Sequence, residues 1–415
     1  MTTYEVQPKR IGDSTVRPPG SKSITNRALI TAGLAVGDSL IVDPLRSDDT
    51  DAMVKCLRTM GVGVEVGDRG FRVSSKGRLR GGRLDVRASG TTARFITAAA
   101  TLAEGPSLVD GTPRMRERPI GPLVDALRAL GATVEASRAE FPPVSVAGGG
   151  LSGGRIRIDG SSSSQFVSAV LLSAPLAETM VTLELGEVVV SRPYLDTTLE
   201  VMAAFGAEAR WLDPTTISVG PTGYRAAGFR VEADASAAVY PWAAAAITGA
   251  AVKVAGIHPA STQADMAALR ILERMGCRLE PGRRGITVAG PESLSGVDAD
   301  LNDCPDASLG LAVVAAFAST PSRFTNIANL RIKETDRLAA LENELTRLGA
   351  GVATGPDWIS ITPGPLRPAR IRTYDDHRIA MAFAVAGLVQ PGIVIENPGC
   401  VAKTWPGFFG MLELL

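Results

Sequence analysis

A segment that recurs five times along the chain limits the possible folds more than any other feature. Each copy reads as an amphipathic helix that ends in a hydrophobic residue and a glycine, followed by a short alternating strand. Glycine is favoured directly after a helix because it tolerates the left-handed conformation there. The final segment, FFGMLELL, fits a sixth copy that is cut short. The five terminal glycines are Gly61, Gly131, Gly206, Gly276 and Gly349.

A second segment alternates with the first and recurs six times. Each copy has a polar cluster, then a helix of small apolar residues, then a strand, and helices that are apolar all round are expected to be buried. Together the two repeats predict an α/β fold of two similar domains. Each domain has three repeated βαβαββ units with buried helices, in an arrangement like an inverse α/β barrel. The polar clusters begin at Ser21, Ser89, Ser161, Asp234, Pro305 and Asp375.

Bulk properties exclude several classes of protein. A chain of 415 residues favours two domains, and a formal net charge of zero does not indicate a nucleic-acid-binding protein. The four cysteines lie far apart, so neither a disulfide framework nor a metal site is expected. The longest mostly apolar run, residues 237–252, is shorter than the roughly 20 residues of a membrane span. We therefore expect a cytoplasmic protein that does not bind membranes.

The starts of the buried helices are candidate anion sites. A helix N-terminus offers free N–H donors and positive potential, and basic residues gather at the same places, which favours a ligand with several phosphate or carboxylate groups. The alternative is that the serines, threonines and aspartates only cap helices and that the cations form ordinary ion pairs. The basic residues are Lys22, Arg27, Arg94, Arg114, Arg116, Arg118, Lys333, Arg337, Arg378 and Lys403.

Two other motifs predict no chemistry. Residues 148–153 match the spacing of a dinucleotide-binding loop, but the alternating segment GRIRIDG follows them where that motif requires a helix. The serine run from Ser161 to Ser164 lacks the GxSxG pattern of a hydrolase nucleophile. We expect no organic cofactor.

Nine stretches between Pro19 and Phe409 together resemble the 3-phosphoshikimate 1-carboxyvinyltransferases, the EPSP synthase family of enolpyruvyl transferases. The resemblance implies two domains that close over the substrates. It places residues 20–233 in the N-terminal domain, on the shikimate 3-phosphate side, and residues 1–19 and 234–415 in the C-terminal domain, on the phosphoenolpyruvate side. The active site is expected in the cleft between them. The stretches are PGSKSITNRAL, SGTTARF, PRMRERPIGPLVDALR, DGSSSSQFVSAVLLSAPLA, VSRPYLDTTL, PDASLGLAV, NLRIKETDRL, YDDHRIAMAF and AKTWPGFF.

The resemblance also implies an activity. The enolpyruvyl group of phosphoenolpyruvate passes to the 5-hydroxyl of shikimate 3-phosphate and phosphate is released, in the biosynthesis of chorismate and the aromatic amino acids. Glyphosate is the expected inhibitor, a monomer is the expected state, and neither a cofactor nor a metal is required.

Site residues follow from the same motifs. The residues that match the family's catalytic groups are Lys22, Asp306 and Glu334. Those that match its shikimate 3-phosphate contacts are Lys22, Ser23, Arg27, Ser163, Ser164, Gln165, Ser191, Tyr194, Asp306, Asn329 and Lys333. Those that match its phosphoenolpyruvate contacts are Lys22, Gly90, Arg118, Gln165, Arg337, Arg378 and Lys403.

Two departures and two alternatives qualify this hypothesis. Ala88 and Ala93 stand where the family usually has Asn and Met. The related UDP-N-acetylglucosamine enolpyruvyl transferases carry Cys or Asp in the loop that corresponds to residues 112–119, and this chain has neither there. A non-catalytic anion-binding repeat protein is the other alternative. Without the resemblance, Asp306 is better explained as a helix cap and Glu334 as an ion-pair partner of Arg337.

Overall fold

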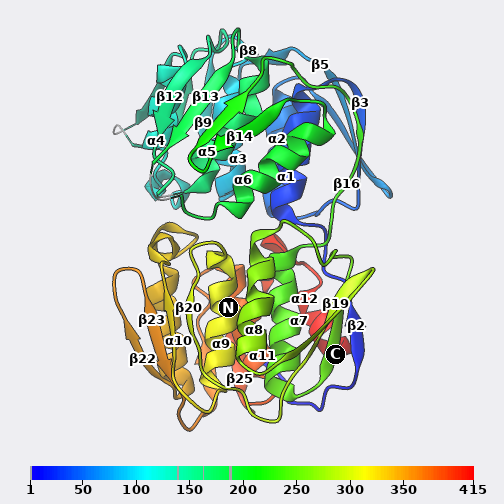
Figure 1. Ribbon diagram of the computed structural model, residues 1–415, viewed down its shortest axis with the longest axis vertical. Helices are drawn as coiled ribbons and strands as arrows, with labels where there is room; N and C mark the ends of the chain where they lie inside the picture. Colours follow the sequence, from blue (N-terminus) through cyan, green and yellow to red (C-terminus); the bar gives the residue numbers. More distant parts are fainter. Residues whose placement is uncertain (1, 138–139, 162, 187–188) are drawn as a thin grey trace. The chain divides into compact units, whose positions relative to one another are not determined.

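Two compact units make up the chain, as the computed structural model shows (Figure 1). The structure describes residues 2–137, 140–161, 163–186 and 189–415. Unit N comprises Gly20–Val231, and unit C comprises Met1–Pro19 together with Glu232–Leu415.

Unit N alternates helices and strands in the order that the repeats predict. Its helices are α1 (Lys22–Leu34), α2 (Asp48–Thr59), α3 (Gly90–Ala100), α4 (Gly121–Ala129), α5 (Ser164–Ser173) and α6 (Pro193–Ala204), with 3₁₀ turns η1 (Met115–Glu117) and η2 (Ala174–Leu176). Its strands are β3 (Val36–Val42), β4 (Gly63–Gly67), β5 (Gly70–Lys76), β6 (Leu79–Arg80), β7 (Arg83–Asp85), β8 (Ala103–Glu104), β9 (Ser107–Asp110), β10 (Val134–Ser137), β11 (Phe141–Val146), β12 (Gly154–Ile158), β13 (Val181–Leu185), β14 (Ala209–Asp213), β15 (Thr216–Val219) and β16 (Gly228–Arg230).

Unit C has the same alternation. Its helices are α7 (Ala235–Thr248), α8 (Ala267–Arg274), α9 (Ser308–Ala316), α10 (Arg337–Leu348), α11 (His377–Ala386) and α12 (Phe408–Leu414), with 3₁₀ turns η3 (Ala264–Met266), η4 (Pro305–Ala307), η5 (Ala328–Ile332) and η6 (Pro398–Lys403). Its strands are β1 (Thr3–Val6), β2 (Ser14–Val16), β17 (Ala251–Ala255), β18 (Arg278–Gly282), β19 (Gly285–Ala289), β20 (Asp298–Asp300), β21 (Ser322–Thr325), β22 (Gly351–Thr354), β23 (Ile359–Thr362), β24 (Ala369–Ile371) and β25 (Ile393–Glu396).

The sheet β12-β13-β15-β14 shows one complete repeat. Helix α5 connects β12 to β13, which pair in parallel. Helix α6 follows, and the chain returns as the antiparallel hairpin β14–β15, whose second strand pairs with β13. The sheets β7-β9-β11-β10 and β20-β21-β23-β22 repeat this order. The predicted βαβαββ units and the α/β class are confirmed.

Strands from distant parts of the chain complete the other sheets. Strand β16, at the end of unit N, pairs in parallel with β3 near its beginning. In unit C, β2 pairs in parallel with β17, and β1 pairs antiparallel with β25. The N-terminal residues are thus built into two sheets of unit C.

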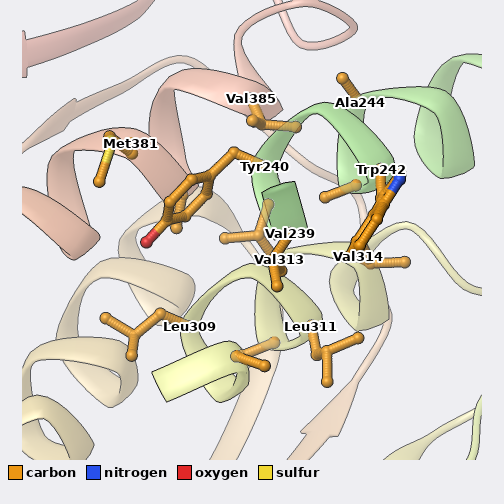
Figure 2. Packing of buried hydrophobic residues seen from close by; sticks show 14 of the residues in the cluster. Val239, Tyr240, Trp242, Ala244, Leu309, Leu311, Val313, Val314, Met381 and Val385 are labelled. Carbon is orange, nitrogen blue, oxygen red and sulfur yellow. The ribbon is translucent and has the colours of Figure 1, made fainter. Parts of the chain in front are cut away.

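Buried helices form the core of each unit. In unit C, α7, α9 and α11 lie side by side, with strands β22 and β23 on one side of them and strands β2 and β19 on the other (Figure 1). Figure 2 shows Trp242 and Tyr240 of α7 among apolar side chains of α9 and α11. A Cβ atom at Gly310 of α9 would lie 2.6 Å from Val239 Cγ1. The small residues of these helices therefore allow their backbones to approach closely.

Helix ends agree with the repeat pattern. All five terminal glycines have positive φ, from 84° at Gly206 to 111° at Gly349. The predicted polar clusters do cap helices, because the side chains of Ser21, Ser89 and Ser163 accept bonds from first-turn amides in unit N. Asp234 and Asp376 do the same in unit C.

Candidate active site

The N-terminus of α1 holds Lys22 against an acid. Ser21 caps the helix, and Lys22 Nζ lies 3.4 Å from Asp49 Oδ2 of α2. Both side chains are largely buried. Asp49 was not among the predicted site residues, and its one signal in the sequence is the acidic start of the helix pattern DDTDAM.

Gly90 and Arg118, two of the predicted site residues, lie close together in unit N. A Cβ atom at Gly90 would lie 2.6–2.9 Å from the Arg118 guanidinium. Arg94, in the second turn of α3, donates to the Pro119 carbonyl at 2.6 Å and so holds the loop that carries Arg118. Arg118 is buried, and its Nε has no hydrogen-bond partner within the described residues. This guanidinium retains donor capacity for an anion.

Arg27 is committed mainly to the interior of unit N. Its guanidinium donates to Thr198 Oγ1 at 2.7 Å, Ser168 Oγ at 3.1 Å and the Tyr194 carbonyl at 3.2 Å. It also donates to the Ser23 carbonyl at 3.1 Å. Burial lowers the pKa of Arg27 to about 10. These bonds join α1, α5 and α6, so Arg27 fixes how the starts of these helices lie.

The remaining predicted residues of unit N lie at the starts of α5 and α6. Ser163 caps α5, Ser164 is buried and Gln165 is half-buried. Ser191 lies just before α6 in the left-handed region, with φ 59°. Tyr194, in the first turn of α6, faces the Arg27 guanidinium with its ring. Ser162 of the serine run lies outside the described residues.

In unit C, Asp306 gathers three of the predicted cations. Its carboxylate accepts from Arg337 Nη1 at 2.9 Å and from Arg378 Nη2 at 2.9 Å, and Lys333 Nζ lies 3.6 Å away. The cap of α9 is Ala307, so the interpretation of Asp306 as a cap is wrong. Burial alone raises the pKa of Asp306, but the charges of Arg378, Lys333 and Arg337 together hold it well below its usual range.

Glu334 and Arg337 form a second contact in the same cluster. Arg337 Nη2 lies 2.9 Å from Glu334 Oε2, as the ion-pair interpretation expects, and Lys403 Nζ lies 3.4 Å from Glu334 Oε1. Arg337 is almost fully buried. Burial lowers its pKa, but Asp376, Glu334 and Asp306 outweigh this and raise the pKa above its usual range.

Asp376 orients the Arg337 side chain and caps the helix that carries Arg378, although the resemblance assigned it no contact with a substrate. It accepts from Arg337 Nε at 2.7 Å and Nη2 at 3.2 Å, and it caps α11 by accepting from the Arg378 amide at 2.9 Å. Most of the five N–H donors of Arg337 are therefore directed at three carboxylates. A ligand at this cluster would meet a guanidinium whose direction is already fixed.

Two further polar residues of unit C, Asn329 and Asp265, are buried. Asn329 is buried, and its Oδ1 has no hydrogen-bond partner within the part of the chain that the structure describes. Asp265, in η3, is buried and accepts from Ser236 Oγ. Burial, and then the charge of Asp306, raise the pKa of Asp265 to about 6. Unit C thus combines buried acids with four gathered cations.

Comparison with known proteins decides the family. The EPSP synthase (3-phosphoshikimate 1-carboxyvinyltransferase) family matches residues 6–412. The chain belongs to the EPSP synthase family. A 3-phosphoshikimate 1-carboxyvinyltransferase of Nostoc punctiforme is 42% identical over all of both chains. One of Methanoculleus marisnigri is 43% identical over 96% of each chain.

Solved structures agree with this family and its fold. An EPSP synthase of Acinetobacter baumannii has a TM-score of 0.82 at 26% identity, over 99% of this chain and 98% of its own. The enolpyruvyl transferase NikO of Streptomyces tendae has a TM-score of 0.80 over 100% of this chain and 96% of its own, and at 18% identity it supports the fold alone. Within the described residues, no helix is both long and apolar enough to span a membrane.

Proposed function

We propose that this EPSP synthase family member transfers the enolpyruvyl group of phosphoenolpyruvate to the 5-hydroxyl of shikimate 3-phosphate and releases phosphate, a step of chorismate and aromatic amino acid biosynthesis. The cluster of Asp306 and Glu334 among four cations in unit C is the observation that carries the proposal. Relatives named for this activity match the whole chain.

The reaction needs the kind of groups that this cluster holds. The transfer breaks the C–O bond of phosphoenolpyruvate, so its methylene carbon must gain a proton while the acceptor hydroxyl loses one. The resulting adduct collapses by losing phosphate and a methyl proton. We assign the hydroxyl proton to Asp306 and the methylene proton to Glu334. Lys22 assists at the leaving oxygen.

Ion pairing in unit C connects binding with proton transfer. Arg337 and Arg378, the proposed partners of the phosphoenolpyruvate carboxylate, pair with Asp306 in this structure. A carboxylate that shares these guanidiniums weakens their hold on Asp306, and the pKa of Asp306 then rises toward that of an effective base. Lys403 and Arg118 are proposed to bind the phosphate, because both are cations with little exposure.

The acceptor is assigned mainly to unit N. Ser23, Ser163, Ser164 and Gln165 lie at the starts of α1 and α5, where side-chain and backbone donors suit a phosphorylated, hydroxyl-rich ring. Ser191, Tyr194 and Arg27 complete this set, with Asn329 and Lys333 of unit C. Within the described residues the buried Oδ1 of Asn329 has no partner, which supports a role as acceptor for a hydroxyl.

Glyphosate sensitivity and a monomeric, cytoplasmic state are part of the same proposal. The absence of a side chain at Gly90 lets the Arg118 guanidinium lie against the α3 backbone. A small anionic inhibitor that occupies the phosphoenolpyruvate site would meet this guanidinium, so glyphosate is expected to bind there. Size-exclusion chromatography with light scattering tests the monomer, and a dimer mass would contradict it.

Phosphate release tests the proposed substrate pair. The enzyme is supplied with phosphoenolpyruvate and either shikimate 3-phosphate or UDP-N-acetylglucosamine. Release is expected only with shikimate 3-phosphate, and Asp306→Ala should abolish it. Release only with the nucleotide sugar would replace the acceptor, and release with neither would support a non-catalytic anion-binding protein.

A further inference from the structure

The loop between β24 and α11 adopts an unfavourable backbone conformation next to the acid–cation cluster. Tyr374 and Asp375 are consecutive and both lie in the left-handed region, with φ 54° and 55°. Residues with a side chain avoid this region because Cβ crowds the backbone, so two in succession persist only where the surroundings hold them. The adjoining residue is Asp376, which accepts from the Arg337 guanidinium and from the backbone amide of Arg378.

A fully buried carboxylate holds the start of this loop. Glu344 of α10 accepts from the Tyr374 hydroxyl at 2.8 Å and from the Arg372 amide at 3.2 Å. The next residue of the loop is held as well, because Asn397 Nδ2 donates to Asp375 Oδ1 at 2.5 Å. Burial and the bond to Glu344 raise the pKa of Tyr374, so its hydroxyl keeps the proton that it donates.

Side chains of helix α10 therefore bind the loop at two points. Glu344 holds its start, and Arg337 holds its end through the two bonds to Asp376. These two residues lie about two turns apart on the same helix and are both buried. The direction of the Asp376 carboxylate is thus tied to the same helix that carries Arg337.

We propose that Glu344 and Tyr374 are positioning residues for phosphoenolpyruvate binding. They keep the strained loop in the one conformation that aims Asp376 at Arg337 and at the first turn of α11. Without them the loop relaxes toward ordinary φ values, Asp376 turns, and Arg337 and Arg378 lose their alignment. The inference rests on the proposed function for the identity of the ligand.

The Tyr374→Phe variant tests this, because it removes only the hydroxyl. Tyr4→Phe is the matched control, since the Tyr4 hydroxyl makes an equivalent bond to Glu413 at 2.7 Å elsewhere in unit C. We expect Tyr374→Phe to raise KM for phosphoenolpyruvate about fivefold or more, as for a lost charge-assisted hydrogen bond. KM for shikimate 3-phosphate should change less than about twofold, and Tyr4→Phe should change neither. Glu344→Gln should act in the same direction, because the Gln side chain has one oxygen instead of two with which to accept from the Tyr374 hydroxyl and the Arg372 amide.

Hydrogen exchange gives a readout that does not depend on turnover. The Arg378 amide, which donates to Asp376, should exchange faster in Tyr374→Phe than in the wild type or in Tyr4→Phe. Unchanged exchange together with an unchanged KM would overturn the positioning role, and so would equal rises in both KM values. If the wild type does not turn over these substrates, the proposed function fails, while the exchange comparison still decides whether Glu344 and Tyr374 hold the loop.

Discussion

Individual acids in unit C determine how its cations are presented. Asp306, Glu334 and Asp376 share Arg337, so this guanidinium is fixed in place before any ligand arrives. Such preorganisation spares the cost of ordering long side chains at the moment of binding. Arg378 and Lys403 lie at the same cluster, where Arg378 contacts Asp306 and Lys403 contacts Glu334.

A substitution at Gly90 tests the contact between the α3 backbone and the Arg118 guanidinium in unit N. In Gly90→Ala the new methyl group would overlap the Arg118 guanidinium, which must move. We expect the KM for phosphoenolpyruvate and the inhibitory concentration of glyphosate both to rise about tenfold or more. A loss of about 1.4 kcal/mol of binding free energy produces a tenfold change. Steady-state kinetics measures both.

Gly228→Ala, also in unit N, serves as the control for this variant, because a Cβ atom there would meet no atom of the described residues within 4 Å. If both constants stay unchanged in Gly90→Ala, the placement of Gly90 beside the phosphoenolpyruvate site is wrong.

Asp265 gives a prediction about pH. Its folded-state pKa of about 6 lies above the ordinary value of 3.8, so its ionisation opposes folding as pH rises through this range. Asp265→Asn should therefore be more stable than the wild type above about pH 6.5, by roughly 1–3 kcal/mol, and the difference should shrink toward zero near pH ~4. Urea unfolding at the two pH values measures it. A difference that is independent of pH, or a less stable variant at high pH, would contradict the assignment.

At the scale of single residues, the motifs identified the cations and acids but not how they pair. Asp306 lies 31 residues from Arg337 and 72 from Arg378 in the chain, so only the fold brings them together. The interpretation of Asp306 as a cap failed because a 3₁₀ turn precedes α9 and shifts the cap to Ala307. Asp49 was missed because an acid in the first turn of a helix is ordinary.

At the scale of elements, the periodicity of the sequence predicted the helices of the repeats. Terminal glycines predicted where the amphipathic helices end, because Gly131 and Gly276 need the left-handed region that other residues avoid. The buried helices were recognisable because they are apolar all round. The two-residue strands β6 and β8 were not predicted, because two residues are too few to show an alternating pattern.

Close packing of the buried helices leads to a prediction for Gly310. Gly310→Ala places a methyl group 2.6 Å from Val239 Cγ1, between α9 and α7. Because a β-branched valine has little rotamer freedom, overpacking should lower the free energy of unfolding by about 1–3 kcal/mol. Thermal or urea denaturation measures this.

A helical glycine in open space provides the comparison. A Cβ atom at Gly410 of α12 would meet no other atom within 4 Å among the described residues, so Gly410→Ala should be neutral or stabilise by up to about 1 kcal/mol. Equal effects of the two substitutions would show that the helices do not pack this closely.

At the scale of the whole molecule, the repeats predicted the architecture but not which strands complete it. The β16–β3 and β2–β17 pairs join residues that lie far apart in sequence, and such pairing leaves no local signal. The division into Gly20–Val231 and the remainder follows from these strands, because each returns the chain to the unit that it completes. The function could be predicted only from the motif resemblance, because the repeats alone are equally typical of a non-catalytic scaffold protein.

The fate of the bridging oxygen of phosphoenolpyruvate tests the central claim most directly. The enzyme is given phosphoenolpyruvate labelled with ¹⁸O between C2 and phosphorus, together with shikimate 3-phosphate, and the products are analysed by mass spectrometry. Enolpyruvyl transfer breaks the C–O bond, so we predict that the released phosphate carries the label and that one enol ether of shikimate 3-phosphate forms for each phosphate. Unlabelled phosphate, with pyruvate and no enol ether, would mean cleavage of the P–O bond and would contradict the proposed function.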